Sequence, residues 1–308
     1  MPDRLLSLIT VLLIAALAPI VAAKIDGVAT QQTSAAPGSA NEMVAVQENV
    51  VYATVSGFEL HLDVYEPARR LEASSPAVVL IHGGGWTDLD KSTMRGMGQL
   101  LARSGFVGFS VDYRLFKVGE NSWPAQLDDV QRAVRWIRSN STKYGVDPQR
   151  IGAFGHSAGA QLAALLGLED TRDNSDPALA KYSSTVQAVV DVSGPADLTS
   201  ERDSEGTRFL TSFLAANYAK NPEVWQAASP VFRVSKNAPP FLIVHGTQDQ
   251  NVPISQAQEL YEKLQAAGVR VFLVKVEDGH TFQTPEARRE LAIETIGFFN
   301  RYLRVVAQ

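Results

Sequence analysis

Cysteine is absent from this chain of 308 residues. Disulfide bonds, thiolate metal ligands and cysteine nucleophiles are therefore excluded, and any covalent catalysis would fall to serine. The five histidines show neither a His-Glu-x-x-His pattern nor the paired spacing that is typical of zinc ligands. We therefore expect no catalytic metal and no cofactor.

An excess of charge of one sign is also lacking. The chain has 28 lysines and arginines against 33 aspartates and glutamates, a net charge of −5. Nucleic acids and anionic membrane surfaces are recognised by basic patches, so this balance indicates neither partner and favours a neutral or weakly polar substrate. Hydrophobic residues at 45% and charged residues at 20% are ordinary for a globular protein with a sizeable core.

The longest hydrophobic run covers residues 5–23 and ends in the small residues Val21-Ala22-Ala23. This pattern is typical of a signal-peptidase site, so we predict a signal peptide over residues 1–23 and a periplasmic or extracellular protein with no stable membrane span after cleavage. About 18 apolar residues can also just span a bilayer, which leaves an N-terminal membrane anchor as the alternative. Residues 24–45 lack periodicity and bulky apolar groups, and we read them as a flexible linker before a folded domain over residues 46–308.

Short apolar runs alternate with helical patterns through the folded domain. Residues 46–55 and 58–65 have the character of two strands joined by a tight turn at Ser56-Gly57. Further apolar runs of the kind found in buried parallel strands cover residues 77–81, 107–111, 151–154, 186–192, 241–244 and 271–276. The alternation predicts an α/β fold with a doubly wound, mostly parallel sheet of eight strands flanked by helices.

Three of the expected helices have identifiable ends or faces. Ser255 and Gln258 have capping-box spacing at the start of one helix, and Gly268 stands where a left-handed C-cap is expected. Thr284-Pro285 opens the last helix, with proline at the first helical position. An earlier helix begins near Pro124, and its apolar positions are Leu127, Val130, Val134 and Ile137.

The pentapeptide Gly155-His156-Ser157-Ala158-Gly159 lies between an apolar strand run and an alanine- and leucine-rich run. A serine hydroxyl is a poor nucleophile at neutral pH, so a catalytic serine has to be held on a strained turn where a base can take its proton. A G-x-S-x-G pattern between a strand and a helix is typical of such a nucleophile elbow. The following helix directs its N-terminal N–H groups at negative charge that develops near the serine.

A glycine run, His82-Gly83-Gly84-Gly85-Trp86, directly follows the strand run at residues 77–81. Consecutive glycines leave backbone N–H groups free to converge on an oxyanion. A phosphate-binding loop is the competing interpretation, but no Gly-Lys-Ser/Thr follows. With Ser157 downstream, the run is interpreted as an oxyanion loop.

Asp249 and His280 each come just after a late strand run. The carboxyl ends of parallel strands meet at one edge of a sheet, where Ser157 is also expected. The order Ser157, Asp249, His280 is the order nucleophile, acid, base of one class of serine triads. Asp278 and Glu277 compete as the acid, but they are too near His280 in sequence to reach its ring easily. For the other histidines we expect structural hydrogen bonds; they are His61, His82, His156 and His245.

Taken together, these segments resemble the α/β-hydrolase superfamily, and within it the carboxylesterases that combine an H-G-G-G-W oxyanion loop with a G-H-S-A-G elbow. The likeness is greatest to the bacterial feruloyl and acetyl esterases and related hormone-sensitive-lipase-like enzymes. It covers about residues 46–304 and is carried by residues 82–86, 111–115, 123–129, 144–148, 151–166, 191–198, 245–249 and 279–280. After Tyr113-Arg114-Leu115 the chain departs from lipase-like relatives, with residues 116–121 in place of Ala-Pro-Glu.

The resemblance implies an α/β-hydrolase catalytic domain with Ser157 as nucleophile, His280 as base and Asp249 as acid. It implies the N–H groups of Gly84, Gly85 and Ala158 as oxyanion donors. As substrate-pocket residues we expect the large apolar side chains near these loops, namely Trp86, Trp123 and Phe282. The aromatic residues of segment 199–237 are expected mainly in the core, although some are placed to line a substrate site; they are Phe209, Phe213, Tyr218 and Trp225.

The function that these observations predict is hydrolysis of small, aromatic or acetyl carboxylic esters through an acyl-enzyme. The substrate would be a small molecule or an ester linked to a polysaccharide. Two alternatives stay open at this point. One is an arylformamidase, amidase or peptidase of the same fold, and the other is a non-catalytic binding protein that retains the hydrolase fold.

Overall fold

The computed structural model describes residues 44–71, 73–200 and 204–304. The predicted signal peptide and most of the predicted linker lie outside these residues, so both stay predictions. The first element within the described residues is a strand that starts at Val44, slightly before the predicted domain start at residue 46. Within the described ranges, no helix combines the length and the apolar character needed to cross a membrane.

Eight strands form one sheet in the order β1-β2-β4-β3-β5-β6-β7-β8. The pairs β1/β2 and β2/β4 are antiparallel, and all pairs from β4 through β8 are parallel. The predicted eight-stranded, mostly parallel sheet is therefore confirmed. The strands are β1 (Val44–Val55), β2 (Phe58–Pro67), β3 (Ser75–Ile81), β4 (Val107–Val111), β5 (Val146–His156), β6 (Ala188–Val192), β7 (Phe241–Gly246) and β8 (Val271–Val276).

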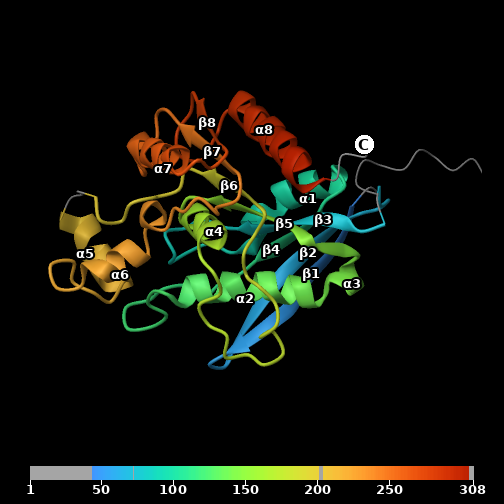
Figure 1. The fold of residues 1–308 in the computed structure, drawn as a ribbon, viewed down its shortest axis with the longest axis horizontal. Helices are drawn as coiled ribbons and strands as arrows, with labels where there is room; N and C mark the ends of the chain where they lie inside the picture. Colours follow the sequence, from blue (N-terminus) through green and yellow to red (C-terminus); the bar gives the residue numbers. More distant parts are fainter. Residues whose placement is uncertain (1–43, 72, 201–203, 305–308) are drawn as a thin grey trace, which may run out of the picture. The chain divides into compact units, whose positions relative to one another are not determined.

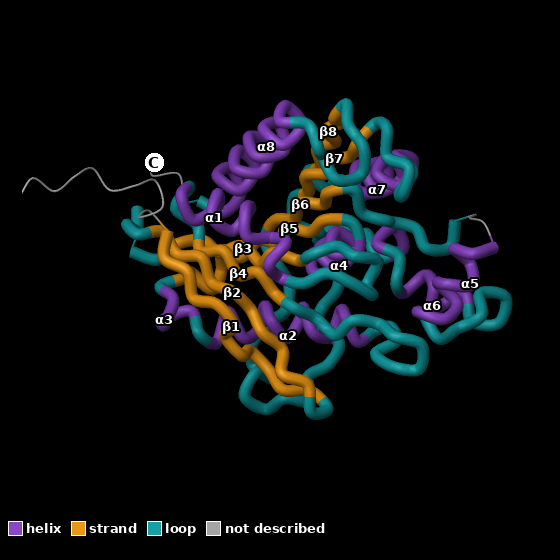
Figure 2. Tube along the Cα trace, turned by 180° about the vertical axis from the view of Figure 1, so that it is seen from behind, coloured by secondary structure: helices purple, strands orange, loops and turns teal. Residues whose placement is uncertain are grey.

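Helices cover both faces of the sheet, and Figures 1 and 2 show α1 and α8 together on one side and α2 on the other. The helices are α1 (Arg95–Arg103), α2 (Ala125–Ser139), α3 (Ser141–Tyr144), α4 (Ala158–Leu168), α5 (Ser204–Phe213), α6 (Pro222–Ala227), α7 (Ile254–Ala266) and α8 (Pro285–Leu303). Two short 3-10 helices, η2 (Lys91–Met94) and η3 (Pro230–Phe232), complete the described elements.

The central strand β3 shows why its sequence is continuously apolar. Side chains alternate between the two faces of a strand, and in this sheet helices cover both faces. Val79 and Ile81 pack into the core cluster that contains α2, α4 and α7, whereas Val78 and Leu80 pack into the cluster that contains α1 and α8. All four side chains are completely buried.

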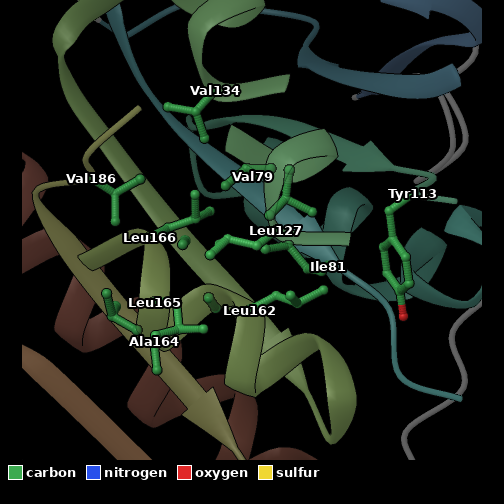
Figure 3. Close-up of a cluster of buried hydrophobic side chains, with 14 of the residues drawn as sticks. Val79, Ile81, Tyr113, Leu127, Val134, Leu162, Ala164, Leu165, Leu166 and Val186 are labelled. Carbon is green, nitrogen blue, oxygen red and sulfur yellow. The ribbon is translucent and has the colours of Figure 1, made fainter. Parts of the chain in front are cut away.

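The larger core lies between the sheet and the helices α2 and α4, as Figure 3 shows. The predicted apolar positions of α2 are all fully buried, which confirms its amphipathic pattern. Against them packs α4, which is apolar on all sides except at Gln161 because the sheet, α2 and η3 surround it. The labelled residues of Figure 3 include Leu127 and Val134 of α2 and Leu162, Leu165 and Leu166 of α4.

Two of the three predicted helix caps agree with the structure. Thr284 caps α8 by accepting the N–H of Ala287, and Pro285 is the first helical residue, as predicted. Gly268 has the expected left-handed conformation, with φ of +77°. The predicted capping box at Ser255 is wrong, because α7 already begins at Ile254 and its cap position is held by Pro253, which makes no side-chain cap bond.

Helix α4 approaches β3 so closely that Gly159 has no room for a side chain. A Cβ atom at this position would lie 2.2 Å from the carbonyl oxygen of Ile81 and 2.4 Å from that of His82. We expect Gly159→Ala to lower the free energy of unfolding by about 1–3 kcal/mol, because backbone has to move. Urea unfolding measures the change.

Gly297 of α8 provides the matched control for this prediction. It is also helical, but a Cβ there would meet nothing within 4 Å. Gly297→Ala is expected to stabilise the protein by ~0.5–1 kcal/mol, the usual gain of alanine over glycine inside a helix. Equal effects of the two substitutions would show that the close approach of α4 to β3 does not constrain Gly159.

Candidate active site

Ser157 lies on the turn between β5, which ends at His156, and α4, which begins at Ala158. Its backbone has φ of 56° and ψ of −122°, a conformation that residues with a side chain rarely adopt. The turn is held by a hydrogen bond from its N–H to the carbonyl oxygen of Val192 at 2.8 Å. Gly155 must be a glycine, because a Cβ there would lie 2.1 Å from the carbonyl oxygen of Gly159. The flanking glycines of the pentapeptide thus permit a strained serine.

His280, on the loop after β8, hydrogen-bonds with both of its predicted partners. Its Nε2 lies 2.8 Å from Oγ of Ser157, and its Nδ1 lies 2.7 Å from Oδ2 of Asp249. An ionised carboxylate only accepts hydrogen bonds, so the ring proton belongs on Nδ1. Nε2 is then an acceptor for the hydroxyl proton of Ser157.

Asp249 is held in place by its own loop after β7. Oδ1 accepts the backbone N–H groups of Asn251 at 2.8 Å and Val252 at 2.9 Å. Burial acts to raise the pKa of this carboxyl, but the hydrogen bonds from His280 and from the two N–H groups outweigh it and lower the pKa below its ordinary value. Asp249 therefore stays ionised beside the imidazole.

The competing acid Asp278 points elsewhere. Its Oδ2 accepts the N–H of Thr284 at 2.8 Å and the hydroxyl of Thr284 at 2.7 Å, and its Oδ1 accepts the N–H of Gly279. The bonds from Thr284 lead the group of contacts that lowers the pKa of Asp278 to about 2. Asp278 thus secures the loop that precedes α8 and makes no bond to the ring of His280.

In the glycine run after β3, Gly85 lines the same cavity as Ser157 and Ala158. Neither Gly85 nor Ala158 donates its backbone N–H to another group of the described chain. Gly84 does not line this cavity. Instead, its carbonyl oxygen accepts the N–H groups of Thr87 and Asp88, both at 3.0 Å, and its φ of +99° shapes the turn.

His82 supports the start of this loop from inside the protein. Its ring stacks on Tyr113 with centroids 4.2 Å apart, and the Tyr113 hydroxyl donates to the carbonyl oxygens of His82 and Gly83 at 3.0 and 3.2 Å. Burial lowers the pKa of His82, so the ring is neutral at neutral pH. The structural role expected for His82 agrees with these contacts.

A cavity of about 290 Å³ opens beside Ser157. Trp86 forms one wall, where its indole donates to Oε1 of Gln161 at 3.2 Å and stacks on Phe213 at 4.6 Å. The residues that complete the lining are mainly apolar and include Pro195, Leu198, Phe209, Leu210 and Val252. Apart from Phe209, whose segment the sequence marked as aromatic, these wall residues and Gln161 were not found from the sequence.

Two of the predicted pocket residues lie elsewhere. Trp123 contacts the edge of Phe213 at 6.2 Å, so it stands behind the wall that Trp86 forms. Phe282 is 2% exposed and packs into the core beneath α1 and α8, although it is only two residues from His280. With φ of 48° at Phe282, the chain turns here, and adjacency in sequence did not predict the direction of the side chain.

The divergent loop after Leu115 contributes to the aromatic wall. Phe116 is 4% exposed and meets both Phe209 and Phe213 edge-on, at 6.2 and 5.6 Å. The backbones of Lys117 and Glu120 exchange two hydrogen bonds, which close the loop into a tight turn. The segment after Tyr113-Arg114-Leu115 thus supports the aromatic wall from behind through Phe116.

Two further histidines brace the site, a role that goes beyond the structural bonds expected for them. His156 donates from Nε2 to the carbonyl oxygen of His280 at 2.9 Å. His245 donates from Nε2 to the carbonyl oxygen of Val252 at 2.9 Å, and the same nitrogen lies 3.3 Å from Oδ2 of Asp249. Burial lowers the pKa of both rings, so they serve as neutral donors.

Asp191, at the carboxyl side of β6, is 2% exposed and accepts the N–H of Gly194 at 3.0 Å. Burial raises its pKa to about 7 in spite of this bond. Between about pH 4 and pH 7 the folded protein therefore keeps a proton on Asp191 that the unfolded chain has lost. Over this range the side chain destabilises the fold increasingly as pH rises.

Asp191→Asn is expected to remove this pH dependence. The stability of the variant relative to the parent should rise between about pH 4 and pH 7, by at most ~1.4 kcal/mol per pH unit, and change little below pH 4. Urea unfolding of both proteins across this range measures it. Parallel pH profiles would contradict a raised pKa at Asp191.

In the described part of the chain, no three His, Asp or Glu side chains converge as metal ligands would. The residues around Ser157 instead have the parts of a covalent mechanism: a strained hydroxyl, a base that hydrogen-bonds with it, an ionised acid, and free N–H groups. Such an arrangement supports acyl transfer.

Comparison with known proteins places this site in context. Residues 62–264 match the family BD-FAE. The chain is 34% identical to Esterase LipC of Mycobacterium tuberculosis over 212 residues, which is 67% of this chain and 52% of LipC. It is 32% identical to Esterase LipQ of the same organism over 75% of this chain and 56% of LipQ. The chain thus spans about half the length of these curated relatives.

Solved structures cover the fold more completely. A truncated carbohydrate esterase from gut microbiota superposes with a TM-score of 0.72 at 28% identity, over 86% of this chain and 99% of that one. Esterase 2 of Thermogutta terrifontis phosphonylated by sarin superposes with a TM-score of 0.73 at 26% identity, over 84% of this chain and 94% of that one. The α/β-hydrolase fold is thereby confirmed.

Proposed function

This chain belongs to the BD-FAE family, and on that premise we propose that it is a serine carboxylic ester hydrolase acting through Ser157, His280 and Asp249. The observation that carries the proposal is the unbroken series of hydrogen bonds from Ser157 through His280 to Asp249, at 2.8 and 2.7 Å, beside an apolar cavity. The esterases among its relatives support it.

In the first half of the reaction, Oγ of Ser157 attacks the carbonyl carbon of the ester while Nε2 of His280 takes the hydroxyl proton. Asp249 holds the ring in the tautomer that leaves Nε2 free, and it stabilises the imidazolium that forms. The N–H groups of Gly85 and Ala158 stabilise the oxyanion, because each is without another partner in the described chain and both residues line the cavity beside Ser157.

Collapse of the tetrahedral intermediate breaks the bond to the alcohol, which leaves with the proton from His280. The acyl group stays on Ser157. Water then enters, gives a proton to His280 and attacks the acyl carbon, and a second tetrahedral intermediate releases the carboxylic acid and restores the serine.

The substrate that this cavity favours is an ester with a small or flat acyl group. The volume of about 290 Å³ is at the lower end for ligand pockets, and the walls are apolar. The nearly parallel rings of Trp86 and Phe209 line the cavity, with the buried ring of Phe213 packed on Trp86, and an aromatic acyl group can stack on the two lining rings. Acetyl and aromatic esters, free or linked to a polysaccharide, fit these features.

A series of p-nitrophenyl esters tests this assignment. We expect efficient hydrolysis of acetate, propionate and butyrate esters and of methyl ferulate, with kcat/KM at least about tenfold lower for long straight-chain esters, because a long chain exceeds the cavity. p-Nitroacetanilide tests the amidase alternative and should react far more slowly. A preference for long chains or for the anilide would contradict the proposal.

Two variants connect the acyl preference to the wall. Phe209→Ala enlarges the cavity and should raise the relative rate on long-chain esters while lowering that on methyl ferulate. Tyr218→Ala is the matched control, since Tyr218 is an aromatic residue of the same segment that is 43% exposed and packs on Trp225. It should leave the acyl preference unchanged.

A further inference from the structure

A second and larger cavity lies on the other side of the catalytic loops, between α1 and α8. It has a volume of about 650 Å³, more than twice that of the cavity beside Ser157. We call it the α1–α8 cavity. Its lining is largely apolar and includes Leu89, Met94, Met97, Leu100, Leu291 and Ala292.

Volumes of about 300–1,000 Å³ with mostly apolar walls and a few polar groups are typical of ligand sites. The walls are well defined, because Phe282 is 2% and Met94 9% exposed, whereas Leu89 at the rim is 47% exposed. The cavity therefore has a packed floor and an open mouth.

Arg288 gives this cavity its polarity. It is the one permanently charged side chain among the described lining residues. Its Nε donates to the carbonyl oxygen of Phe282 at 2.9 Å, which fixes the side chain, and its terminal amino groups have no partner within the described residues. A fixed guanidinium with free N–H groups above an apolar space is complementary to a carboxylate that carries an apolar tail.

The same cavity contacts the supports of the catalytic residues. Gly83 belongs to the oxyanion loop and precedes Gly84 and Gly85, Thr281 follows His280, and His156 donates to the carbonyl oxygen of His280 at 2.9 Å. A ligand that packs against these three residues changes the position of the base without entering the cavity beside Ser157. Such a ligand alters turnover rather than competing with the ester.

We propose that the α1–α8 cavity binds a monocarboxylic acid with an apolar tail, its carboxylate paired with Arg288 and its tail packed among Met94, Met97 and Leu291. Binding is independent of the proposed function. The consequence for activity rests on it: the butyric or aromatic acid that the proposed reaction releases belongs to this class, and it feeds back on His280 through His156.

Calorimetric titration of the full chain carrying Ser157→Ala with sodium octanoate tests the binding step. Octanoate should bind, and 1-octanol and octylamine should bind at least about tenfold more weakly, because they lack the carboxylate. Arg288→Gln and Ala292→Trp should each weaken octanoate binding about tenfold or more, the first by removing the charge and the second by filling the cavity. Arg288→Lys should retain most of the affinity.

Arg301→Gln is the matched control, because Arg301 is also an exposed arginine of α8 but does not line this cavity. Its octanoate affinity should equal that of the parent. Circular dichroism shows whether each variant is folded. Unchanged binding in folded Arg288→Gln and Ala292→Trp, or equal binding of 1-octanol, would overturn the proposal.

Kinetics with p-nitrophenyl acetate tests the coupling. Octanoate should change kcat at least about twofold with KM unchanged, and Arg288→Gln should abolish this response. A rise in KM alone would place octanoate in the cavity beside Ser157 and contradict the coupling. If the parent hydrolyses no ester, the proposed function fails while the titration still decides the binding site.

Discussion

Ser157→Ala is expected to lower kcat for p-nitrophenyl acetate by ~10⁵–10⁶, the effect of removing the nucleophile from a serine triad. The variant should remain folded, because Oγ of Ser157 bonds to His280 alone among the described side chains and the turn is held by backbone contacts. Stopped assays at high enzyme concentration and urea unfolding measure the two properties.

Ser193→Ala is the matched control for this variant. Ser193 follows the neighbouring strand β6, is completely buried, and also has a left-handed backbone, with φ of 54°. Its Oγ has no hydrogen-bond partner among the described residues. Turnover should change by less than about twofold, since loss of this hydroxyl is expected to have only a small effect on local packing.

Covalent labelling gives an independent reading of the same hypothesis. A fluorophosphonate should add one adduct to the parent and none to Ser157→Ala, as judged by intact mass, and the adduct should map to the peptide that contains Gly155–Gly159. Hydrolysis that persists in Ser157→Ala, or a label on another serine, would refute the nucleophile assignment.

Asp249→Asn is expected to lower kcat by ~10⁴ with little change in KM. The Asn amide can present its NH₂ group to Nδ1 of His280, which moves the ring proton to Nε2 and removes the acceptor for the hydroxyl of Ser157. The negative charge that stabilises the imidazolium is lost as well. Steady-state kinetics at neutral pH measures both parameters.

Asp278→Asn distinguishes the two candidate acids of the loops around His280. Its carboxylate accepts hydrogen bonds from Thr284 and Gly279. Its loss should therefore affect the loop before α8 and the pH dependence of stability in acid, and leave kcat little changed. The pKa of about 2 means that Asp278 stabilises the fold above about pH 4 and loses this effect as pH falls toward 2. A loss of rate as large as that of Asp249→Asn would reverse the assignment.

The sequence predicted the elements of the sheet well, because their signals are local. The run at residues 77–81 is apolar throughout and that at 107–111 apolar except for Ser110, and both are strands with every residue buried. Thr284-Pro285 and Gly268 were read correctly because capping chemistry depends on neighbouring residues only. The start of α7 was missed, since Ser255 has the right spacing but the chain enters the helix at Ile254.

The three catalytic residues could be predicted from the sequence, because each lies just after the end of a predicted strand. Ser157, Asp249 and His280 each follow a parallel strand, and parallel strands end at the same edge of a sheet, so these residues meet. The choice of Asp249 over Asp278 followed from sequence distance, and the contacts of Asp278 with Thr284 agree with it.

What lines the cavity was decided by the tertiary structure. Trp86, Trp123 and Phe282 are all large, apolar and close in sequence to catalytic loops, yet Trp86 alone of the three lines the cavity beside Ser157. Side-chain direction depends on the backbone turn at each residue and on the partners available, as the packing of Trp123 on Phe213 shows.

The fold and the order of nucleophile, acid and base could be predicted from local sequence patterns, because hydrophobic period, glycine positions and strand ends depend on residues that are close together along the chain. The acyl wall, the contact of His245 with Asp249 and the α1–α8 cavity beneath Arg288 are visible only in the folded protein. These features join residues far apart in sequence, such as Met97 and Leu291, and their contacts arise only when helices pack across the sheet.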